Sequence, residues 1–237
     1  MKKPSIKFGS FKQYEKVFIT AADGVDIENI KAVAFDGEVL YIAEPEYLIE
    51  YSKGNLKKVP AKISNLFSRK GKLYASVGNA LAEVKKGKLK KIAEFDSPVI
   101  DISVALDGSM WLITETDLYL QENGEFVQVV ELPDQTVCLA ALDNKAKYDE
   151  TVYVGSTVEG LLSMKGKRRH WAELMPDVTG VLSKKINCIA IDALGHLWVG
   201  SDEGLNIYDG KNYWFNGNDF YSVPAGKFND MFFAADG

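Results

Sequence analysis

The sequence INCIAIDALGHLWVGSDEGLNIYDGKNYWFNG, residues 186 to 217, contains four short runs that are typical of β-strands. The runs cover residues 186–192, 196–201, 205–208 and 212–215, and turn-forming residues separate them. Four short strands joined in succession by tight turns predict one antiparallel blade of a β-propeller.

The same pattern recurs along the chain in aligned columns. An aromatic residue marks each second strand, at Tyr41, Tyr74, Trp111, Tyr153 and Trp198. A leucine marks each third strand, at Leu48, Leu81, Leu118, Leu161 and Leu205, and a glycine follows at Gly54, Gly87, Gly124, Gly166 and Gly210. Blades need large apolar residues to pack on their neighbours and glycine where hairpins reverse tightly. We therefore interpret the aromatic column as packing between blades.

These columns predict an all-β fold, a β-propeller of four-stranded antiparallel blades. Five full blades are expected at about 30–62, 63–98, 99–136, 137–185 and 186–227, within one domain that covers residues 1–237. Residues 228–237 match a first strand, and residues 5–20 resemble a last strand, so the two ends are expected to share a sixth blade. An incomplete, larger ring is the alternative.

The charge of the chain disfavours nucleic acid and anionic membranes as partners. The net charge is −5, which gives no bulk attraction to nucleic acid or to anionic membranes. No apolar run is long enough to span a bilayer, and the first residues lack the apolar region of a signal peptide. The chain is expected to be soluble as written, while its compartment and oligomeric state stay open.

Residues 186–217 resemble the two-component regulator propeller repeat. The matching residues are Asp192, Gly195, Leu197, Trp198, Val199, Gly200, Gly204, Leu205, Tyr208, Asp209 and Gly210. The resemblance implies a β-propeller, and proteins with these repeats are often extracytoplasmic sensor domains. The matching positions are structural, so the resemblance brings no catalytic residues with it.

Residues able to carry catalysis or bind metal are sparse. Cys138 and Cys188 lie in first strands without a C-x-x-C motif, which favours two buried free thiols. His170 and His196 occupy different blade positions, so a paired metal site is not expected. The sequence therefore predicts no metal, no cofactor and no catalytic residue.

Charged residues separate onto two faces of the predicted propeller. Turns between second and third strands, and the links between blades, carry Glu44, Glu46, Glu115, Asp117, Glu159, Asp202 and Glu203, with Asp23, Asp26, Asp96, Asp134, Asp177 and Asp219. We call this the acidic face. The opposite turns carry mostly basic residues: Lys53, Arg69, Lys70, Lys72, Lys85, Lys86, Lys88, Lys165, Lys167 and Arg168. Solvated turns explain both sets, whereas a functional interpretation makes the acidic face a binding surface.

The long link 216–227 adds Phe220 and Tyr221 beside Asp219, and aromatic rings next to a carboxylate suit sugar or cation recognition. The rings equally suit a small core beneath the link. The candidate ligand-binding residues are Asp202, Glu203, Asp219, Phe220, Tyr221, Glu159 and Glu115.

These features favour a non-enzymatic, sensor-like propeller that binds a small polar ligand (a sugar or a cation) or a protein on the acidic face. Two alternatives stay open: a polysaccharide lyase-type enzyme and a protein–protein scaffold. A lyase acting on anionic sugars needs a basic cleft, which the acidic face does not offer.

Overall fold

The computed structural model describes residues 19–36, 39–69, 71–105, 107–142, 150–165, 170–174, 183–208, 214–216 and 226–231. In these ranges a single 3-10 turn, η1 (Ala21–Asp23), precedes strands β1 to β20. The strands form five four-stranded antiparallel sheets, each with its strands in chain order. The predicted all-β propeller with five full blades is thereby confirmed.

Each blade occupies one continuous stretch of the chain. Blade 1 contains β1 (Ala32–Asp36), β2 (Val39–Ala43), β3 (Tyr47–Ser52) and β4 (Asn55–Pro60), and blade 2 contains β5 (Asn65–Arg69), β6 (Lys72–Val77), β7 (Ala80–Lys85) and β8 (Lys88–Glu94). Blade 3 contains β9 (Val99–Val104), β10 (Met110–Thr114), β11 (Asp117–Glu122) and β12 (Glu125–Glu131). Blade 4 contains β13 (Thr136–Ala141), β14 (Glu150–Ser156), β15 (Gly160–Lys165) and β16 (Trp171–Glu173). Blade 5 contains β17 (Ile186–Ile191), β18 (Leu197–Ser201), β19 (Leu205–Tyr208) and β20 (Trp214–Asn216).

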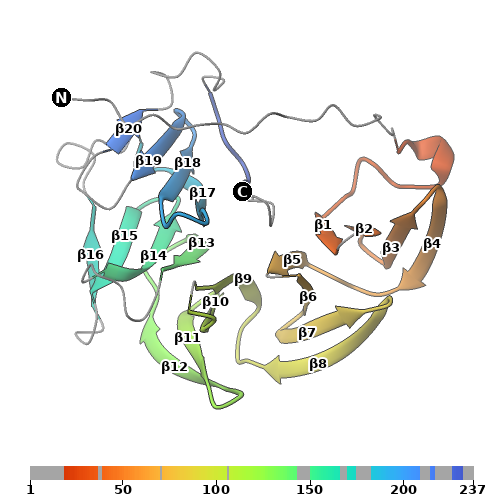
Figure 1. Ribbon diagram of the computed structural model, residues 1–237, viewed down its shortest axis with the longest axis horizontal. Coiled ribbons are helices and arrows are strands. Elements are labelled where there is room, and N and C mark those ends of the chain that lie inside the picture. The colour runs from red at the N-terminus through yellow and green to blue at the C-terminus, as the bar shows by residue number, and fades with distance from the viewer. Residues whose placement is uncertain are drawn as a thin grey trace.

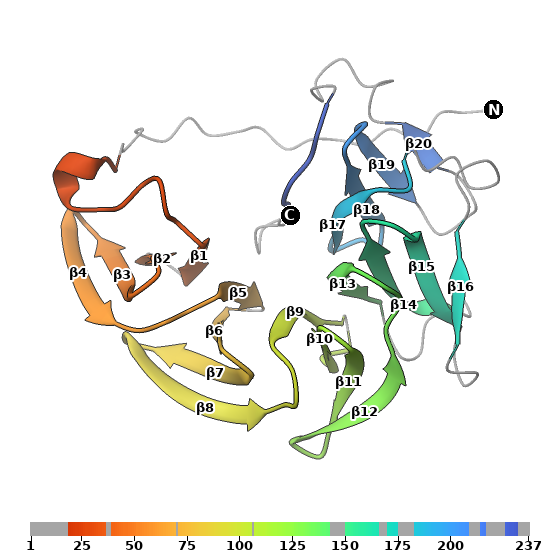
Figure 2. The same cartoon turned by 180° about the vertical axis from the view of Figure 1, so that it is seen from behind.

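The blades are arranged around a common centre. The first strand of every blade lies toward the middle of the ring, and the fourth strand lies at its periphery (Figures 1 and 2). Blades 2, 3 and 4 each lie between two neighbours in chain order, and successive inner strands contact each other across the blade boundaries.

A further inner segment begins after blade 5. Phe228 N donates to Ser201 O at 2.9 Å, and Asn187 Nδ2 donates to Phe228 O at 3.0 Å. Residues 226–231 thus lie beside blade 5, where the inner strand of a following blade is expected. The other parts of the predicted sixth blade, residues 5–18 and 232–237, lie outside the described residues.

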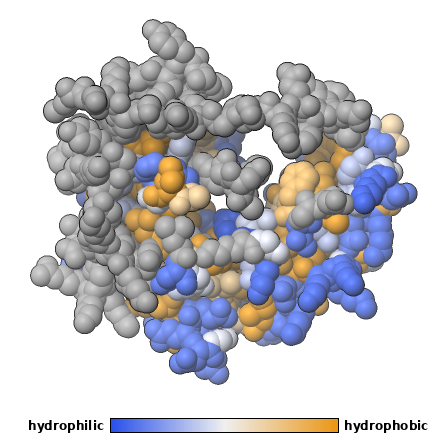
Figure 3. All heavy atoms as spheres, in the orientation of Figure 1, coloured by the Kyte–Doolittle hydropathy of each residue, from blue (hydrophilic) through white to orange (hydrophobic). Residues whose placement is uncertain are grey.

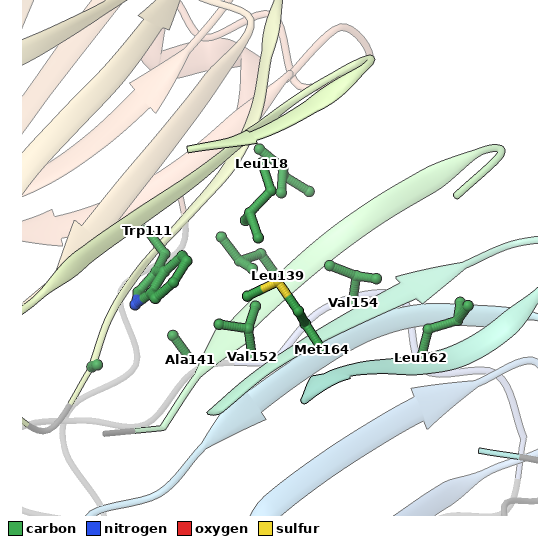
Figure 4. Close-up of a cluster of buried hydrophobic side chains, with 10 residues drawn as sticks. Trp111, Leu118, Leu139, Ala141, Val152, Val154, Leu162 and Met164 are labelled. Carbon is green, nitrogen blue, oxygen red and sulfur yellow. The ribbon is translucent and has the colours of Figure 1, made fainter. Parts of the chain in front are cut away.

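Four of the five residues in the aromatic column pack between blades, as predicted, whereas Trp198 of blade 5 is partly exposed. Tyr41, Tyr74, Trp111 and Tyr153 are each buried in a cluster shared with the next blade along the chain. Figure 4 shows the blade 3–4 cluster, in which Trp111 and Leu118 of blade 3 face Leu139, Val152 and Met164 of blade 4. Burial of these large side chains holds neighbouring blades together.

The third-to-fourth strand hairpins have the expected turn chemistry. In blade 1, Lys53 and Gly54 have φ values of 50° and 82°. Positive φ at both central residues defines a type I′ turn, whose twist matches that of the flanking strands. Lys86–Gly87 and Asn123–Gly124 repeat this geometry in blades 2 and 3, whereas Gly166 and Gly210 lie outside the described residues.

Both cysteines are buried free thiols, as predicted, and both pack against a glycine of the second strand. A Cβ built on Gly155 would lie 2.5 Å from Cys138 Sγ and 2.5 Å from Ile186 Cγ2. A Cβ on Gly200 would lie 2.5 Å from Cys188 Sγ and 2.8 Å from Phe228 Cβ. The next inner segment therefore packs on a cysteine–glycine pair in both places, so Phe228 occupies the position relative to blade 5 that Ile186 occupies relative to blade 4.

Replacement of Gly155 by Ala is expected to lower the free energy of unfolding by about 1–3 kcal/mol, because the added methyl group overpacks the blade 4–5 boundary. Denaturant unfolding of Gly155→Ala measures the loss. Adding Cys138→Ala should recover part of it by removing one of the two clashing atoms. An unchanged stability of the single variant would contradict this packing.

Candidate functional site

Links between blades meet the second-to-third strand turns on one face of the propeller. Asp134 N, in the link before blade 4, donates to Glu159 Oε1 at 2.8 Å. Asp26 N donates to Glu44 Oε1 at 2.7 Å, and Lys58 Nζ lies 3.0 Å from Glu44 Oε2. Glu44 is only 3% exposed. Carboxylates expected on the acidic face therefore include some that bind the protein's own backbone and lysines.

Asp202 is the clearest example of a candidate residue with internal partners. It accepts a hydrogen bond from Asn187 Nδ2 at 2.8 Å and forms ion pairs with Lys185 at 2.9 Å and Lys227 at 3.4 Å. The Asn187 hydrogen bond, followed by the Lys185 contact, lowers the pKa of Asp202 to about 2. The two lysines directly precede Ile186 and Phe228 in the chain, so Asp202 joins blade 5 to residues 226–231.

The other candidate residues are distributed over three blades. Glu115, Glu159 and Glu203 lie in the second-to-third strand turns of blades 3, 4 and 5, and all three are exposed. Asp202 lies next to Glu203, whereas the turns of blades 3 and 4 belong to other sheets. Asp219, Phe220 and Tyr221 lie outside the described residues.

Charge also separates around the ring, from one blade to the next. Residues 92–142, which span the end of blade 2, blade 3 and the first strand of blade 4, contain ten Asp or Glu residues and no Lys or Arg. We call this stretch the acidic sector. The preceding residues 49–91 contain twelve Lys or Arg residues and two Glu. Two of these carboxylates are paired with cations of the preceding stretch, Glu94 with Lys91 and Asp101 with Arg69.

A groove lies within the acidic sector, between blades 2 and 3. It has a volume of about 580 Å³ and is lined by residues 92–96 of blade 2 and its link, and by Tyr119 and residues 124–126 and 128 of blade 3. The groove is open to solvent rather than enclosed. Near the ends of β8 and β12, Figure 3 shows a hydrophobic strip flanked by hydrophilic atoms.

Three aromatic rings form the floor of the groove. Phe95 packs edge-on against Tyr119, with ring centroids 4.8 Å apart, and against Phe126, with centroids 5.5 Å apart. Phe95 is buried, while Tyr119 and Phe126 are partly exposed. Burial, followed by the charges of Asp117 and Asp96, raises the pKa of Tyr119. The Tyr119 hydroxyl thus stays neutral beside two carboxylates.

Carboxylates surround this aromatic floor. Asp96 and Glu125 are exposed and form no ion pair with a described residue. Glu94 is paired with Lys91, and Asp117 accepts hydrogen bonds from Gln128 and Thr116. This groove was not predicted from the sequence, because the acidic residues were assigned to turns. The absence of Lys and Arg from residues 92–142 could have indicated it.

A partly buried carboxyl group lies on the inner strand of blade 3. Asp101 Oδ2 accepts from Leu139 N of blade 4 at 2.9 Å, and Asp101 Oδ1 lies 3.5 Å from the Arg69 guanidinium of blade 2. Burial raises the pKa of Asp101 to about 6, and Arg69 opposes that shift only in part. Asp101 therefore bridges three blades and becomes charged only near neutral pH.

The His196–Asp192 pair has a structural explanation. Asp192 Oδ2 binds His196 Nδ1 at 2.8 Å and Trp198 Nε1 at 3.1 Å, while Asp192 Oδ1 accepts from Leu194 N and His196 N. One carboxylate thus closes the first-to-second strand turn and fixes the tryptophan. This accounts for the Asp and Trp positions of the repeat.

Neither a metal site nor a membrane-spanning helix is found in the part of the chain that the structure describes. No group of three or more His, Cys, Asp or Glu residues there is arranged to hold a metal ion. No helix formed by those residues could cross a bilayer.

Comparisons with known proteins agree with the repeat. The family described as two component regulator propeller matches residues 180–203, which confirms the predicted resemblance for that stretch. No curated protein matches the chain.

Solved structures share the fold at low identity. A gluconolactonase from Xanthomonas campestris superposes with a TM-score of 0.62 at 14% identity, covering 87% of this chain and 80% of that one. The extracellular domains of two putative hybrid two component systems from B. thetaiotaomicron give TM-scores of 0.59 and 0.58 at 13% and 16% identity. These alignments cover 84% and 86% of this chain and 30% of each relative. The present chain thus spans less than a third of those two proteins, and such likeness shows the fold alone.

The raised pKa of Asp101 predicts a pH-dependent stability. A carboxyl group whose pKa is higher in the folded state than in the unfolded state favours folding when protonated. Its contribution is fully present below about pH 4 and is lost as pH rises to about 6. The loss is about 2–3 kcal/mol.

Urea unfolding of the wild type and of Asp101→Asn at about pH 4 and about pH 7.5 measures the contribution of Asp101. The contribution is the difference between the two free energies of unfolding at each pH. The stability of the wild type relative to the variant should fall between the lower and the higher pH. A difference that is the same at both values would contradict the assignment.

Replacement of Asp202 by Asn is expected to loosen residues 226–231, because both lysine ion pairs are lost. Hydrogen exchange at the Phe228 amide should become several-fold faster, while the Ala141 amide in blade 4 should be unaffected. Glu203→Gln is the matched control at the adjacent residue. Equal exchange rates at Phe228 in all three proteins would show that Asp202 does not hold the segment.

Proposed function

We propose that this chain is a non-enzymatic β-propeller that binds a small polar ligand or a protein through its acidic surface. The observation that carries the proposal is the acidic sector, ten carboxylates without a Lys or Arg, which contains a groove of ligand size. Exposed Glu115, Glu159 and Glu203 extend the acidic surface to the turns of blades 3, 4 and 5.

A binding role fits the way in which the polar groups are used. The His196–Asp192 pair and Asp202 are occupied in holding turns and segments together. The exposed carboxylates, in contrast, accept hydrogen bonds and attract cations without any further catalytic group. An acidic surface also disfavours the lyase alternative, because anionic sugars would be repelled.

Among binding functions, we favour a sensing role. The two component regulator propeller repeat at residues 180–203 supports it, and so does the fold shared with extracellular domains of putative two component systems. In such a role, the bound ligand would stabilise the propeller and the change would be read by another protein segment or partner.

Thermal unfolding with a panel of Ca²⁺, neutral oligosaccharides, polyamines and lysine-rich peptides tests the proposal. A ligand at about 100 times its dissociation constant should stabilise the chain by roughly 2.7 kcal/mol, which raises the midpoint by several degrees. Stabilisation by any member supports binding. If no member changes the midpoint and no protein partner is captured on the immobilised chain, the proposal fails.

A further inference from the structure

We infer that the groove between blades 2 and 3 binds an alkylammonium group, with the methylene stem over the aromatic floor and the charged nitrogen at the carboxylate rim. This inference rests on the proposed binding function and specifies its site and its ligand class. The site differs from the turns of blades 4 and 5 that the sequence favoured.

The floor of the groove suits an organic cation. Phe95 holds the rings of Tyr119 and Phe126 through edge contacts, which keeps both rings in fixed positions along the groove. Aromatic faces carry partial negative charge and attract an ammonium group, and rings also contact methylene groups favourably. A hydrated metal ion gains nothing from such a floor.

The rim supplies the complementary charge. Asp96 comes from the link after blade 2, and Glu125 comes from the start of β12, so carboxylates line the groove from both blades. Glu94 also lines the groove, but its carboxylate is already paired with Lys91. Asp96 and Glu125 form no ion pair with a described residue and are available to a ligand.

Other ligand classes fit less well. Hard cations such as Ca²⁺ require six to eight oxygen ligands, and the described residues contain no group of acidic side chains arranged to hold a metal. A neutral sugar would stack on the rings and donate hydrogen bonds to the carboxylates, but it would gain no charge attraction from them. An alkylammonium ion uses the rings and the carboxylates together, as lysine side chains do when their stems lie on apolar surface.

The same chemistry occurs in free polyamines and in lysine side chains of a peptide. Isothermal titration of the full chain at low salt, with spermidine in one arm and a hexalysine peptide in the other, separates these sources. Binding of spermidine indicates a small-molecule amine, whereas binding of the peptide alone indicates a lysine-bearing protein. Both results support the site if the variants below behave as stated.

Asp96→Asn with Glu125→Gln removes two exposed carboxylates from the rim while keeping side-chain size. The dissociation constant of whichever probe binds should rise by roughly 2- to 30-fold, the range expected for two exposed ion pairs. Phe126→Leu keeps an apolar residue but removes a ring, and it should weaken binding roughly 2- to 5-fold. Unchanged thermal midpoints of the free variants show that the fold is intact.

Glu159→Gln with Glu203→Gln is the matched control, since it also removes two carboxylates but on blades 4 and 5. It should leave the dissociation constant within twofold of the wild-type value. Equal weakening of binding by both double variants would indicate diffuse charge attraction. It would overturn the assignment of the binding site to the groove.

Weakening of binding by the control variant alone would place the ligand at the turns of blades 4 and 5. This result would overturn the assignment of the site to the groove but would keep the proposed binding function. Absence of binding by both probes would overturn the inference. A sugar or Ca²⁺ that still raises the thermal midpoint would leave the binding function standing.

Discussion

A blade whose strands are apolar on both faces needs a neighbouring blade on each side, and the packing of blades 2, 3 and 4 depends on that constraint. All residues of β10 are buried, yet they do not share one core. Trp111 packs in the cluster with blade 4, whereas Leu112 packs in the cluster with blade 2. Successive residues of a strand point to opposite faces, so a central strand with two apolar faces is stable only between two neighbours.

The same constraint explains why the fold could be predicted from the sequence. Because every blade satisfies it in the same way, the aromatic and leucine positions recur as columns, and Tyr41, Tyr74, Trp111 and Tyr153 were assigned correctly to packing between blades. The candidate site was less predictable. Whether a carboxylate is available depends on groups distant in sequence: Lys227 reaches Asp202 from the following segment, and Lys58 reaches Glu44 from another strand. The aromatic floor likewise joins Phe95 of one blade with Phe126 of the next, which no repeat column reveals.

The proposed binding function depends on charged residues that differ from one blade to the next. The packing positions are shared by all five blades, but the acidic sector belongs to blade 3 and its borders, and the basic stretch before it belongs to blades 1 and 2. If the proposed cationic ligand binds there, this distribution would orient it before contact, since attraction and repulsion lie on adjacent parts of the ring. The Asp101 carboxyl group, which links three blades from the inner strand of blade 3, couples the packing of this region to pH.

The most direct test of the account is the position of a bound amine in a crystal structure of the chain grown with spermidine. We expect electron density for the amine along the groove between β8 and β12, with a nitrogen within hydrogen-bond distance of Asp96 or Glu125 and methylene groups over Tyr119 or Phe126. An amine bound instead at the turns of blades 4 and 5, or a groove that contains only water at saturating spermidine, would contradict it.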